Sequence, residues 1–185
     1  MKDMGERSNR QYFFSTMQSP LGQLKIMAGG DSLAAVLWEK EIPGRVRLSA
    51  SEEYDAHPVL IEAKRQLAEY FAGERRAFDL KLDFAGTEFQ KSVWQALLMI
   101  PYGETRSYGE LAQQLGNHKA VRAVGAANGR NPISIIVPCH RVIGASGSLT
   151  GFGGGLEAKA FLLNLESKQM PLGSPEGRFV RNARV

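Results

Sequence analysis

The fold of the second half is decided by residues 87–129, which read TEFQKSVWQALLMIPYGETRSYGELAQQLGNHKAVRAVGAANG. The segment opens with Thr87-Glu88-Phe89-Gln90, the pattern of a helix capping box. Apolar residues then recur at helical spacing as far as Ile100, and Pro101 follows directly. The spacing therefore predicts a helix over 87–100.

Two shorter helices follow in the same stretch. Ser107-Tyr108-Gly109-Glu110 repeats the capping box, and Gly116 stands where a helix C-terminus is expected. A further helix is predicted over 119–127. Short helices joined by a turn that contains glycine are typical of a helix-turn-helix, which is common on DNA and also in helical domains that bind none.

The helix predicted over 119–127 has two different sides. Val121 and Val124 are expected to face the core, whereas Arg122 points elsewhere. Ala123 and the small residues that follow it keep the surface flat. A flat helix can approach a large partner closely.

Outward from this stretch, residues 133–137 form a β-branched run that predicts a short buried strand. This strand leads into Pro138-Cys139-His140-Arg141-Val142. The cysteine is therefore expected at the junction of an apolar strand and a polar turn.

The first half has the pattern of a small sheet with one helix. Strands are predicted over 12–16, 23–28, 33–38 and 78–84, with a turn at 29–31 and a loop over 42–56. Pro58 opens an amphipathic helix that ends at Gly73. This helix has an apolar face, formed by Ala63, Leu67, Tyr70 and Phe71.

The predicted fold class follows from these elements. An α/β N-terminal domain, with a small antiparallel sheet plus a helix, precedes a mainly α C-terminal domain. The latter contains the helix-turn-helix and the short strand that leads to Cys139. We place the boundary near Gly86, which gives domains 1–86 and 87–167 and a basic, flexible tail over 168–185.

Composition narrows the function. The chain has 185 residues, a formal net charge of +4 and a pI near 9.3, which mildly favours a polyanionic partner. With one cysteine, no intramolecular disulfide and no zinc site built on several thiolates can form. The first ten residues lack the apolar core of a secretory signal and no stretch is long enough to span a bilayer, so we expect a cytoplasmic protein.

Cys139 has two possible roles, a buried structural residue or a reactive thiol. A thiol reacts as the thiolate, and a neighbouring imidazole or positive charge lowers its pKa. His140 and Arg141 supply such neighbours directly beside it. The neighbours therefore favour a nucleophile at Cys139, with His140 as its base.

The residues 138–142 resemble the signature of the O6-alkylguanine-DNA alkyltransferases, also called methylated-DNA-protein-cysteine methyltransferases. The resemblance runs from Phe89 to Glu166 and is that of bacterial members without a fused metal-binding regulatory domain. It is carried by further matches in the family's order and spacing, namely Arg122-Ala123-Val124-Gly125, Asn131-Pro132, Gly154-Gly155-Leu156, Lys159 and Glu166.

The resemblance implies a chemical role for several residues. Cys139 attacks the alkyl carbon and keeps the group, Glu166 orients His140, and His140 draws the thiol proton away through a water. Tyr108 donates a hydrogen bond to the guanine ring as negative charge develops there. Asn131 ties the strand that carries the cysteine to the recognition helix.

The resemblance also implies how the damaged base is reached. The nucleotide is flipped out of the duplex through the minor groove, and Arg122 on a helix with small neighbours such as Ala123 fills its place. Val142, Phe152 and Gly153 form the substrate pocket. Many relatives have tyrosine at 152 and some have serine at 153, so we hypothesise that Gly153 widens tolerance for bulkier alkyl groups.

The expected partner is double-stranded DNA with alkylated guanine, bound without sequence preference through phosphates. O4-alkylthymine is a further candidate substrate. We expect no cofactor, no metal and no membrane, and a monomer, with cooperative binding on DNA left open. The basic tail contains Lys168, Arg178, Arg181 and Arg184.

Two other functions remain as alternatives. A sensor could flip alkylated guanine without transferring the alkyl group, although sensor relatives carry another residue in place of Cys139. A Cys-His hydrolase is the second, although adjacent Cys and His rarely face each other and the sequence has no oxyanion motif.

Overall fold

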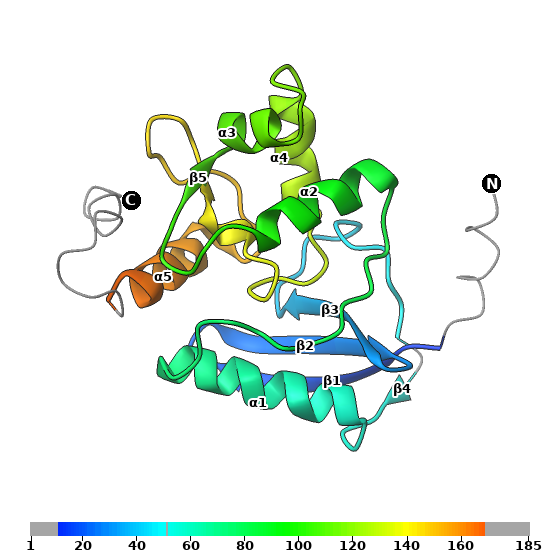
Figure 1. Cartoon of the computed structure of the whole chain (residues 1–185). Coiled ribbons are helices and arrows are strands. Elements are labelled where there is room, and N and C mark those ends of the chain that lie inside the picture. Colours follow the sequence, from blue (N-terminus) through cyan, green and yellow to red (C-terminus); the bar gives the residue numbers. More distant parts are fainter. Residues whose placement is uncertain (1–10, 51, 169–185) are drawn as a thin grey trace.

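The computed structural model describes residues 11–50 and 52–168. The first half is built on a four-stranded sheet of order β3-β2-β1-β4 (Figure 1). β1 (Phe13–Ser19), β2 (Gly22–Gly29) and β3 (Ser32–Trp38) are antiparallel neighbours, as predicted. β4 (Glu52–Glu53) pairs in parallel with β1. It lies inside the segment 42–56 that was predicted to be a loop, since two adjacent glutamates carry no strand pattern.

The helix α1 (Pro58–Ala72) covers one face of this sheet, as the sequence predicted. His57 caps its start, since the Nδ1 atom accepts a hydrogen bond from the Val59 N–H at 3.2 Å. Gly73 ends it with a φ of 82°, a conformation that favours glycine. Alternate residues of β2 pack with α1 in the main core, whereas Met27 belongs to a smaller cluster on the other face.

The strand predicted over 78–84 is wrong. Only Leu82 forms a bridge, to Leu33 of β3, where the Leu33 N–H donates to the Lys81 carbonyl and the Asp83 N–H to the Leu33 carbonyl, both at 2.8 Å. The alternating apolar side chains of this extended segment pack against the core instead. The alternation of apolar and polar residues over 78–84 therefore reflects burial of one side of the segment and not a continuous ladder of strand hydrogen bonds.

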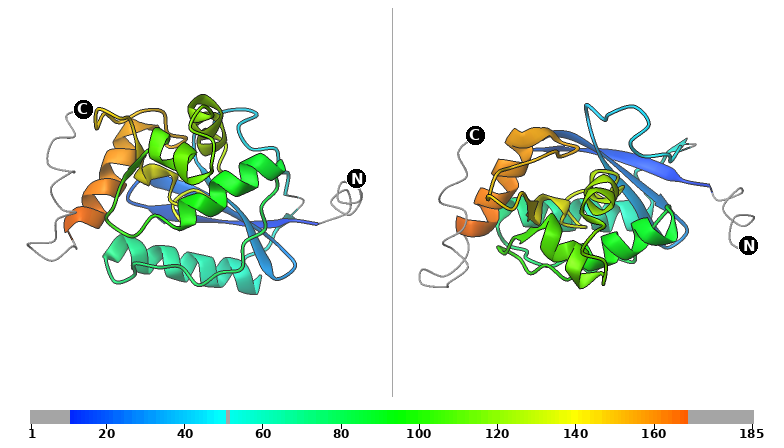
Figure 2. Two further views of the ribbon diagram at one scale, coloured as in Figure 1. Left: turned by 45° about the horizontal axis from the view of Figure 1, so that its top comes forward. Right: turned by 90° about the horizontal axis from the view of Figure 1, so that it is seen from above.

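The second half is mainly helical, so the predicted fold class is confirmed. Its helices are α2 (Glu88–Leu98), α3 (Tyr108–Gln114), α4 (Val121–Gly129) and α5 (Gly155–Lys168). Both predicted capping boxes are formed, by Thr87 with Gln90 and by Ser107 with Glu110. Figure 2 shows that α2 to α5 gather on one side of the sheet, and that the start of β1 and the end of α5 lie at opposite ends of the molecule.

A second, two-stranded sheet joins the start of the helix-turn-helix to the chain beyond the cysteine. β5 (Arg106–Ser107) pairs in parallel with β6 (Val142–Ile143). The helix-turn-helix, α3 and α4, is therefore tied, through the two residues that precede α3, to the segment that follows Cys139.

The strand predicted over 133–137 is also wrong, although every residue of it is buried. The chain meets β3 only at Val36, whose N–H donates to the Pro132 carbonyl at 2.9 Å and whose carbonyl accepts from the Ser134 N–H at 3.2 Å. It then turns, with Ile135 at a φ of 72°. The β-branched composition of this run arises from burial in a turn and not from a strand.

Some predicted helix faces also differ from those in the structure. Val121 of α4 is 39% exposed, although it was expected to face the core, and Val124 is buried as expected. On α5, two charged side chains, Lys159 and Glu166, are buried because each has polar partners in the core. The predicted boundary near Gly86 stays a prediction, and the tail beyond Lys168 lies outside the described residues.

Within residues 11–50 and 52–168, no helix has both the length and the apolar character needed to cross a membrane.

Candidate active site

Cys139 begins a short 3-10 helix, Cys139–Arg141, between the buried turn and β6. Cys139 is 4% exposed, and its thiol is not part of a disulfide. The Cys139 N–H donates to the Val137 carbonyl at 2.8 Å, and the Arg141 N–H donates to the Pro138 carbonyl at 3.0 Å. The backbone around the thiol is therefore fixed by the turn on one side and by the 3-10 helix on the other.

Asn131 holds the turn that delivers the cysteine. Its side chain is fully buried, and its Nδ2 donates to the Val137 carbonyl at 2.8 Å while its Oδ1 accepts from the Ile133 N–H at 3.0 Å. The Asn131 N–H donates to the Asn128 carbonyl at the end of α4. One residue thus links α4 to both ends of the turn, and residues 129–131 at this link are called the hinge below.

His140 and Glu166 form a buried pair, as the resemblance implied. His140 Nε2 lies 2.8 Å from Glu166 Oε1, and both side chains have at most 1% of their surface exposed. Burial lowers the pKa of His140 below its ordinary value, an effect that Glu166 only partly opposes. His140 Nδ1 is buried without a hydrogen-bond partner among the described residues.

Glu166 is the centre of a larger polar network. Arg141 donates from Nε to Oε2 and from Nη2 to Oε1, both at 2.9 Å, and Tyr70 of α1 donates to Oε1 at 2.8 Å. The Gly103 N–H donates to Oε2 at 3.2 Å. Burial raises the pKa of Glu166, but His140 and Arg141 outweigh it and hold that pKa well below its usual range. Glu166 is therefore ionised.

The positive charges that act on the Cys139 thiol are not that of Arg141, the neighbour proposed from the sequence. Burial raises the pKa of the Cys139 thiol, and the groups that oppose this rise are Asn131, Arg45 and Lys159. Arg141 was proposed from the sequence as a neighbour that favours the thiolate, but its guanidinium faces Glu166 and the Ile100 carbonyl. Arg141 therefore neutralises the Glu166 carboxylate, and the positive charges that act on the Cys139 thiol are those of Arg45 and Lys159, which are distant in the sequence.

Lys159 is a buried cation beside the cysteine. It has no exposed surface, and its Nζ donates to the Val142 carbonyl at 2.6 Å and to the Thr150 carbonyl at 2.8 Å. Burial lowers its pKa to about 8, which Cys139 opposes. Lys159 thus joins the strand after Cys139 to the loop before α5. The sequence marked this lysine only through the resemblance.

Arg45 was missed by the sequence analysis because it lies in the polar segment that was assigned to a loop. Its Nη1 donates to the Asn131 carbonyl at 2.8 Å and to the Gly129 carbonyl at 3.2 Å, and its Nη2 donates to Glu41 Oε2 at 2.9 Å. The side chain is only 7% exposed. A residue of the first half therefore clamps the hinge of the second.

The residues predicted to form the substrate pocket, together with Tyr108, lie on several elements. Val142 is buried, whereas Tyr108, Phe152 and Gly153 are half-buried. The Tyr108 hydroxyl accepts a hydrogen bond from Thr150 Oγ1 at 3.2 Å, which ties the first residue of α3 to the loop.

The loop before α5 is packed closely against the first half. The Phe152 ring lies edge-on to Trp38 with centroids 5.5 Å apart. A Cβ built on Gly154 would lie 2.6 Å from Trp38, and one built on Gly153 would lie 2.9 Å from the Arg45 Cζ. A side chain at 153 would need the Arg45 guanidinium to move, and a side chain at 154 would need the Trp38 ring to move.

Arg122 and Ala123 are exposed on α4, away from its buried side at Val124. The Trp94 Nε1 of α2 donates to the Ala127 carbonyl of α4 at 2.9 Å, which fixes α4 against α2. Arg122 and Ala123 are therefore presented to solvent on a helix held in a fixed position, whereas Tyr108 is half-buried on α3.

Within the described ranges, 11–50 and 52–168, no three His, Cys, Asp or Glu side chains are grouped so that they could hold a metal ion. The absence of a cofactor stays a prediction.

Comparison with known proteins gives two family matches that cover most of the chain. Residues 12–84 match "6-O-methylguanine DNA methyltransferase, ribonuclease-like domain", and residues 88–168 match "6-O-methylguanine DNA methyltransferase, DNA binding domain". A methylated-DNA–protein-cysteine methyltransferase of Methanosarcina acetivorans is 52% identical over 155 residues, which are 83% of this chain and 97% of that protein. One of Mycobacterium leprae is 54% identical over 84% of this chain and 92% of that protein.

Solved structures agree with these matches. The crystal structure of the Mycobacterium tuberculosis O6-methylguanine methyltransferase has 50% identity and a TM-score of 0.77, covering 88% of this chain and 96% of that one. The structure of Mycobacterium tuberculosis OGT in complex with DNA has 48% identity and the same TM-score of 0.77, over 92% and 98%. The chain therefore belongs to the 6-O-methylguanine DNA methyltransferase family.

Proposed function

We propose that this protein repairs duplex DNA by transferring the alkyl group of O6-alkylguanine to Cys139 in a single, irreversible reaction. The observation that carries the proposal is the buried arrangement of one free thiol beside His140 and Glu166. The names of the relatives and of the DNA-bound neighbour support DNA as the partner. O4-alkylthymine is a second candidate substrate.

In the proposed reaction, His140 Nδ1 takes the thiol proton through a water, and Glu166 stabilises the imidazolium that results. The Cys139 sulfur then attacks the alkyl carbon. A sulfur–carbon bond forms as the carbon–oxygen bond breaks, and guanine leaves with the electron pair while Tyr108 donates a hydrogen bond to it.

The product explains why the protein acts once. A thioether at Cys139 has no activated carbon and a poor leaving group, so water does not regenerate the thiol. Each molecule therefore removes one alkyl group, and the reaction is stoichiometric. The thiolate supplies both the bonding electrons and the acceptor atom, so the reaction needs no cofactor.

Access to the lesion requires base flipping, because the reacting carbon lies within a stacked duplex. We propose that α4 lies in the minor groove, that Arg122 fills the place of the extruded base, and that Ala123 allows close approach. Phosphate contacts give affinity without sequence preference. We further propose that the protein works as a monomer in the cytoplasm.

The test is the intact mass of the protein after it is mixed with duplex DNA that contains O6-methylguanine. We expect every active molecule to gain one methyl group in place of a hydrogen, and peptide mapping to place it on Cys139. The Cys139→Ser variant should gain nothing and leave the lesion in the DNA. An unmodified parent, as for a sensor, or an adduct that does not depend on the lesion, as for a hydrolase, would contradict the proposal.

A further inference from the structure

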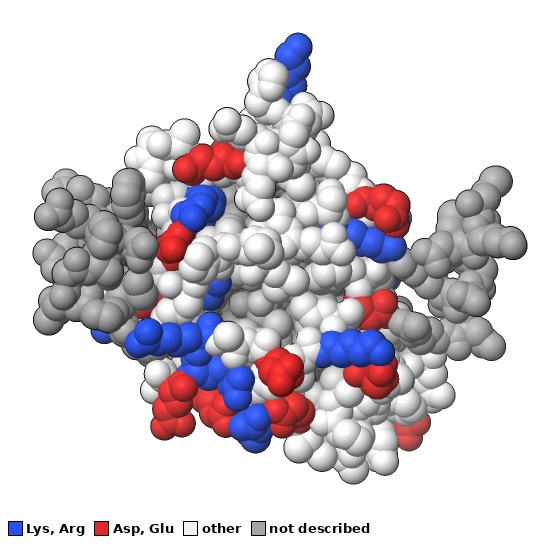
Figure 3. Space-filling model, in the orientation of Figure 1, with Lys and Arg blue, Asp and Glu red and all other residues white. Residues whose placement is uncertain are grey.

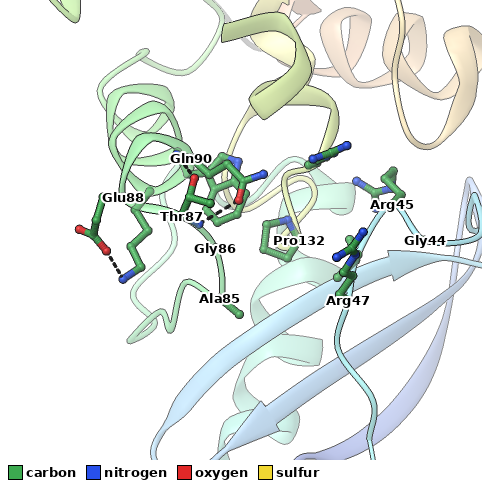
Figure 4. Close-up of a pocket in the computed structure, with 13 residues that line it drawn as sticks. Gly44, Arg45, Arg47, Ala85, Gly86, Thr87, Glu88, Gln90 and Pro132 are labelled. Atoms are coloured by element: carbon green, nitrogen blue, oxygen red, sulfur yellow. Dashed lines mark hydrogen bonds and ion pairs between the residues drawn. The ribbon is translucent and has the colours of Figure 1, made fainter. Parts of the chain in front are cut away.

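A groove that shares Arg45 with the site described above lies between the two halves of the molecule. It has a volume of about 640 Å³, within the range of ligand-binding clefts. Figure 4 shows Arg45 and Arg47 on one side, Thr87 and Gln90 at the start of α2 on the opposite side, and Pro132 between them. Both halves of the chain are therefore needed to form this groove.

The groove is lined by more positive than negative charge. Its cations are Arg45, Arg47, Lys91 and Arg130, and Glu88 is the one acidic residue of its lining among the described residues. Arg45 is ion-paired with Glu41, and Lys91 lies 2.7 Å from Glu88. Arg47 and Arg130 are exposed and have no acidic partner in the described part of the chain. Two uncompensated positive charges thus face the same groove.

The surface of α1 is different. Arg65 pairs with Glu62 and Glu69, and Arg75 also pairs with Glu69. Figure 3 shows basic and acidic side chains interleaved over this region, at the bottom of the view. Charge on α1 is therefore largely neutralised locally, whereas the charge of Arg47 and Arg130 remains available to an outside anion.

The groove has a fixed position relative to the helix-turn-helix. Arg130 directly follows the last residue of α4, and its N–H donates to the Ala127 carbonyl at 3.1 Å. The bond from Trp94 to Ala127 holds α2, which forms one wall, against α4. The groove therefore lies at the C-terminal end of α4, in a fixed position relative to this helix.

We propose that this groove binds the sugar–phosphate backbone of the duplex beside the lesion, with Arg47 and Arg130 each contacting a phosphate. The proposal rests on the proposed function, which places α4 against DNA. An extended polyanion fits a cationic groove that continues the end of α4, and phosphate contacts carry no sequence information, as an unrestricted repair protein requires. The first half of the chain, through Arg47, thereby takes part in DNA binding.

The test measures how binding to an undamaged duplex depends on salt, in the full chain. Each phosphate contact contributes about 0.9 to the slope of log K against log salt concentration. The double variant Arg47→Gln/Arg130→Gln should therefore have a slope smaller by about 2, and weaker binding at low salt. Its rate of reaction with free O6-benzylguanine, which has no phosphate, should equal that of the parent.

The matched control is Lys40→Gln/Lys81→Gln, which removes the same charge at two exposed lysines outside the groove lining. This control should keep the parental slope. An unchanged slope in the groove variant, or an equal decrease in the control, overturns the proposal. A parent that binds DNA with the expected slopes but never alkylates Cys139 would contradict only the proposed function.

Discussion

His140 is the residue at which charge state decides the chemistry. Burial lowers its pKa, so the folded protein releases the proton at a pH at which the unfolded chain, with a histidine pKa of about 6.5, still binds it. The free energy of unfolding should therefore rise as the pH increases toward about 6.5, and it should fall as the pH decreases below about 6.5. Urea unfolding between pH 5 and 8 should show this loss.

The matched control for His140 is the exposed His118. We expect His140→Gln to flatten the dependence on pH in this window, and His118→Gln to keep it. NMR of the His140 ring should show the proton on Nε2, which faces Glu166, and titration below 6.5. A His140 that is protonated at pH 7 would contradict a role as the base.

Glu166 is the residue whose negative charge balances the site. Glu166→Gln keeps the shape of the side chain but leaves the buried Arg141 guanidinium without its carboxylate partner. Loss of one member of a buried pair costs about 3–5 kcal/mol, so the free energy of unfolding should fall by that order and alkyl transfer should slow. Glu157→Gln, at an exposed position of α5, should change neither. Equal stabilities for the two variants would show that Arg141 does not depend on this charge.

At the scale of the elements, the loop before α5 and the loop after β3 are coupled through Gly153 and Arg45. A side chain at 153 needs the Arg45 guanidinium to move, but Glu41 and the hinge carbonyls hold it. Gly153→Ser should therefore lower the free energy of unfolding by about 1–3 kcal/mol, as overpacking does. Gly151→Ser, where a Cβ meets nothing within 4 Å, should stay within about 0.5 kcal/mol of the parent.

A double-mutant cycle with Arg45→Met isolates this coupling, since removal of the guanidinium makes room at 153. We expect Gly153→Ser to cost less in the Arg45→Met background than in the parent. The same variants test whether Gly153 widens tolerance for large alkyl groups. Equal ratios of methyl to benzyl transfer in Gly153→Ser and the parent would count against that hypothesis.

The elements also show what the sequence could predict. α1, α2 and α3 were predictable because caps and helical spacing act locally, within a few residues of each terminus. The segments 78–84 and 133–137 were not, because alternating or β-branched apolar residues are equally suited to buried segments without a ladder.

Some residues of the candidate site could likewise be predicted from the sequence, whereas others could not. Cys139 and His140 are neighbours in the chain, so their chemistry could be predicted from the sequence, and the resemblance supplied Glu166 and Asn131. Arg45 and the Tyr70 hydroxyl reach the site only through tertiary packing, and no local pattern marks them. Charged residues in a polar loop have no signal that separates a buried clamp from a solvated side chain.

At the scale of the whole molecule, the two halves share their central interactions. Val36 of β3 bonds to the turn before Cys139, Arg45 bonds to the hinge, and Tyr70 of α1 bonds to Glu166. These contacts join the sheet and its helix to the site of the second half. We therefore expect a single cooperative unfolding transition that is the same by tryptophan fluorescence and by far-UV circular dichroism.

Tyr70→Phe tests this connection, because it removes one buried hydrogen bond between the halves and leaves the ring in place. The Glu166 oxygen keeps its other donors, so the free energy of unfolding should fall by about 1 kcal/mol, as for a typical hydrogen bond to a partner that stays satisfied. Tyr54→Phe, at a 46% exposed ring, should leave stability unchanged. Since the remaining contacts still join the halves, the transition should stay single in both variants. Separate transitions for the two halves in Tyr70→Phe would mean that this one bond, and not the whole interface, couples the sheet to the active site.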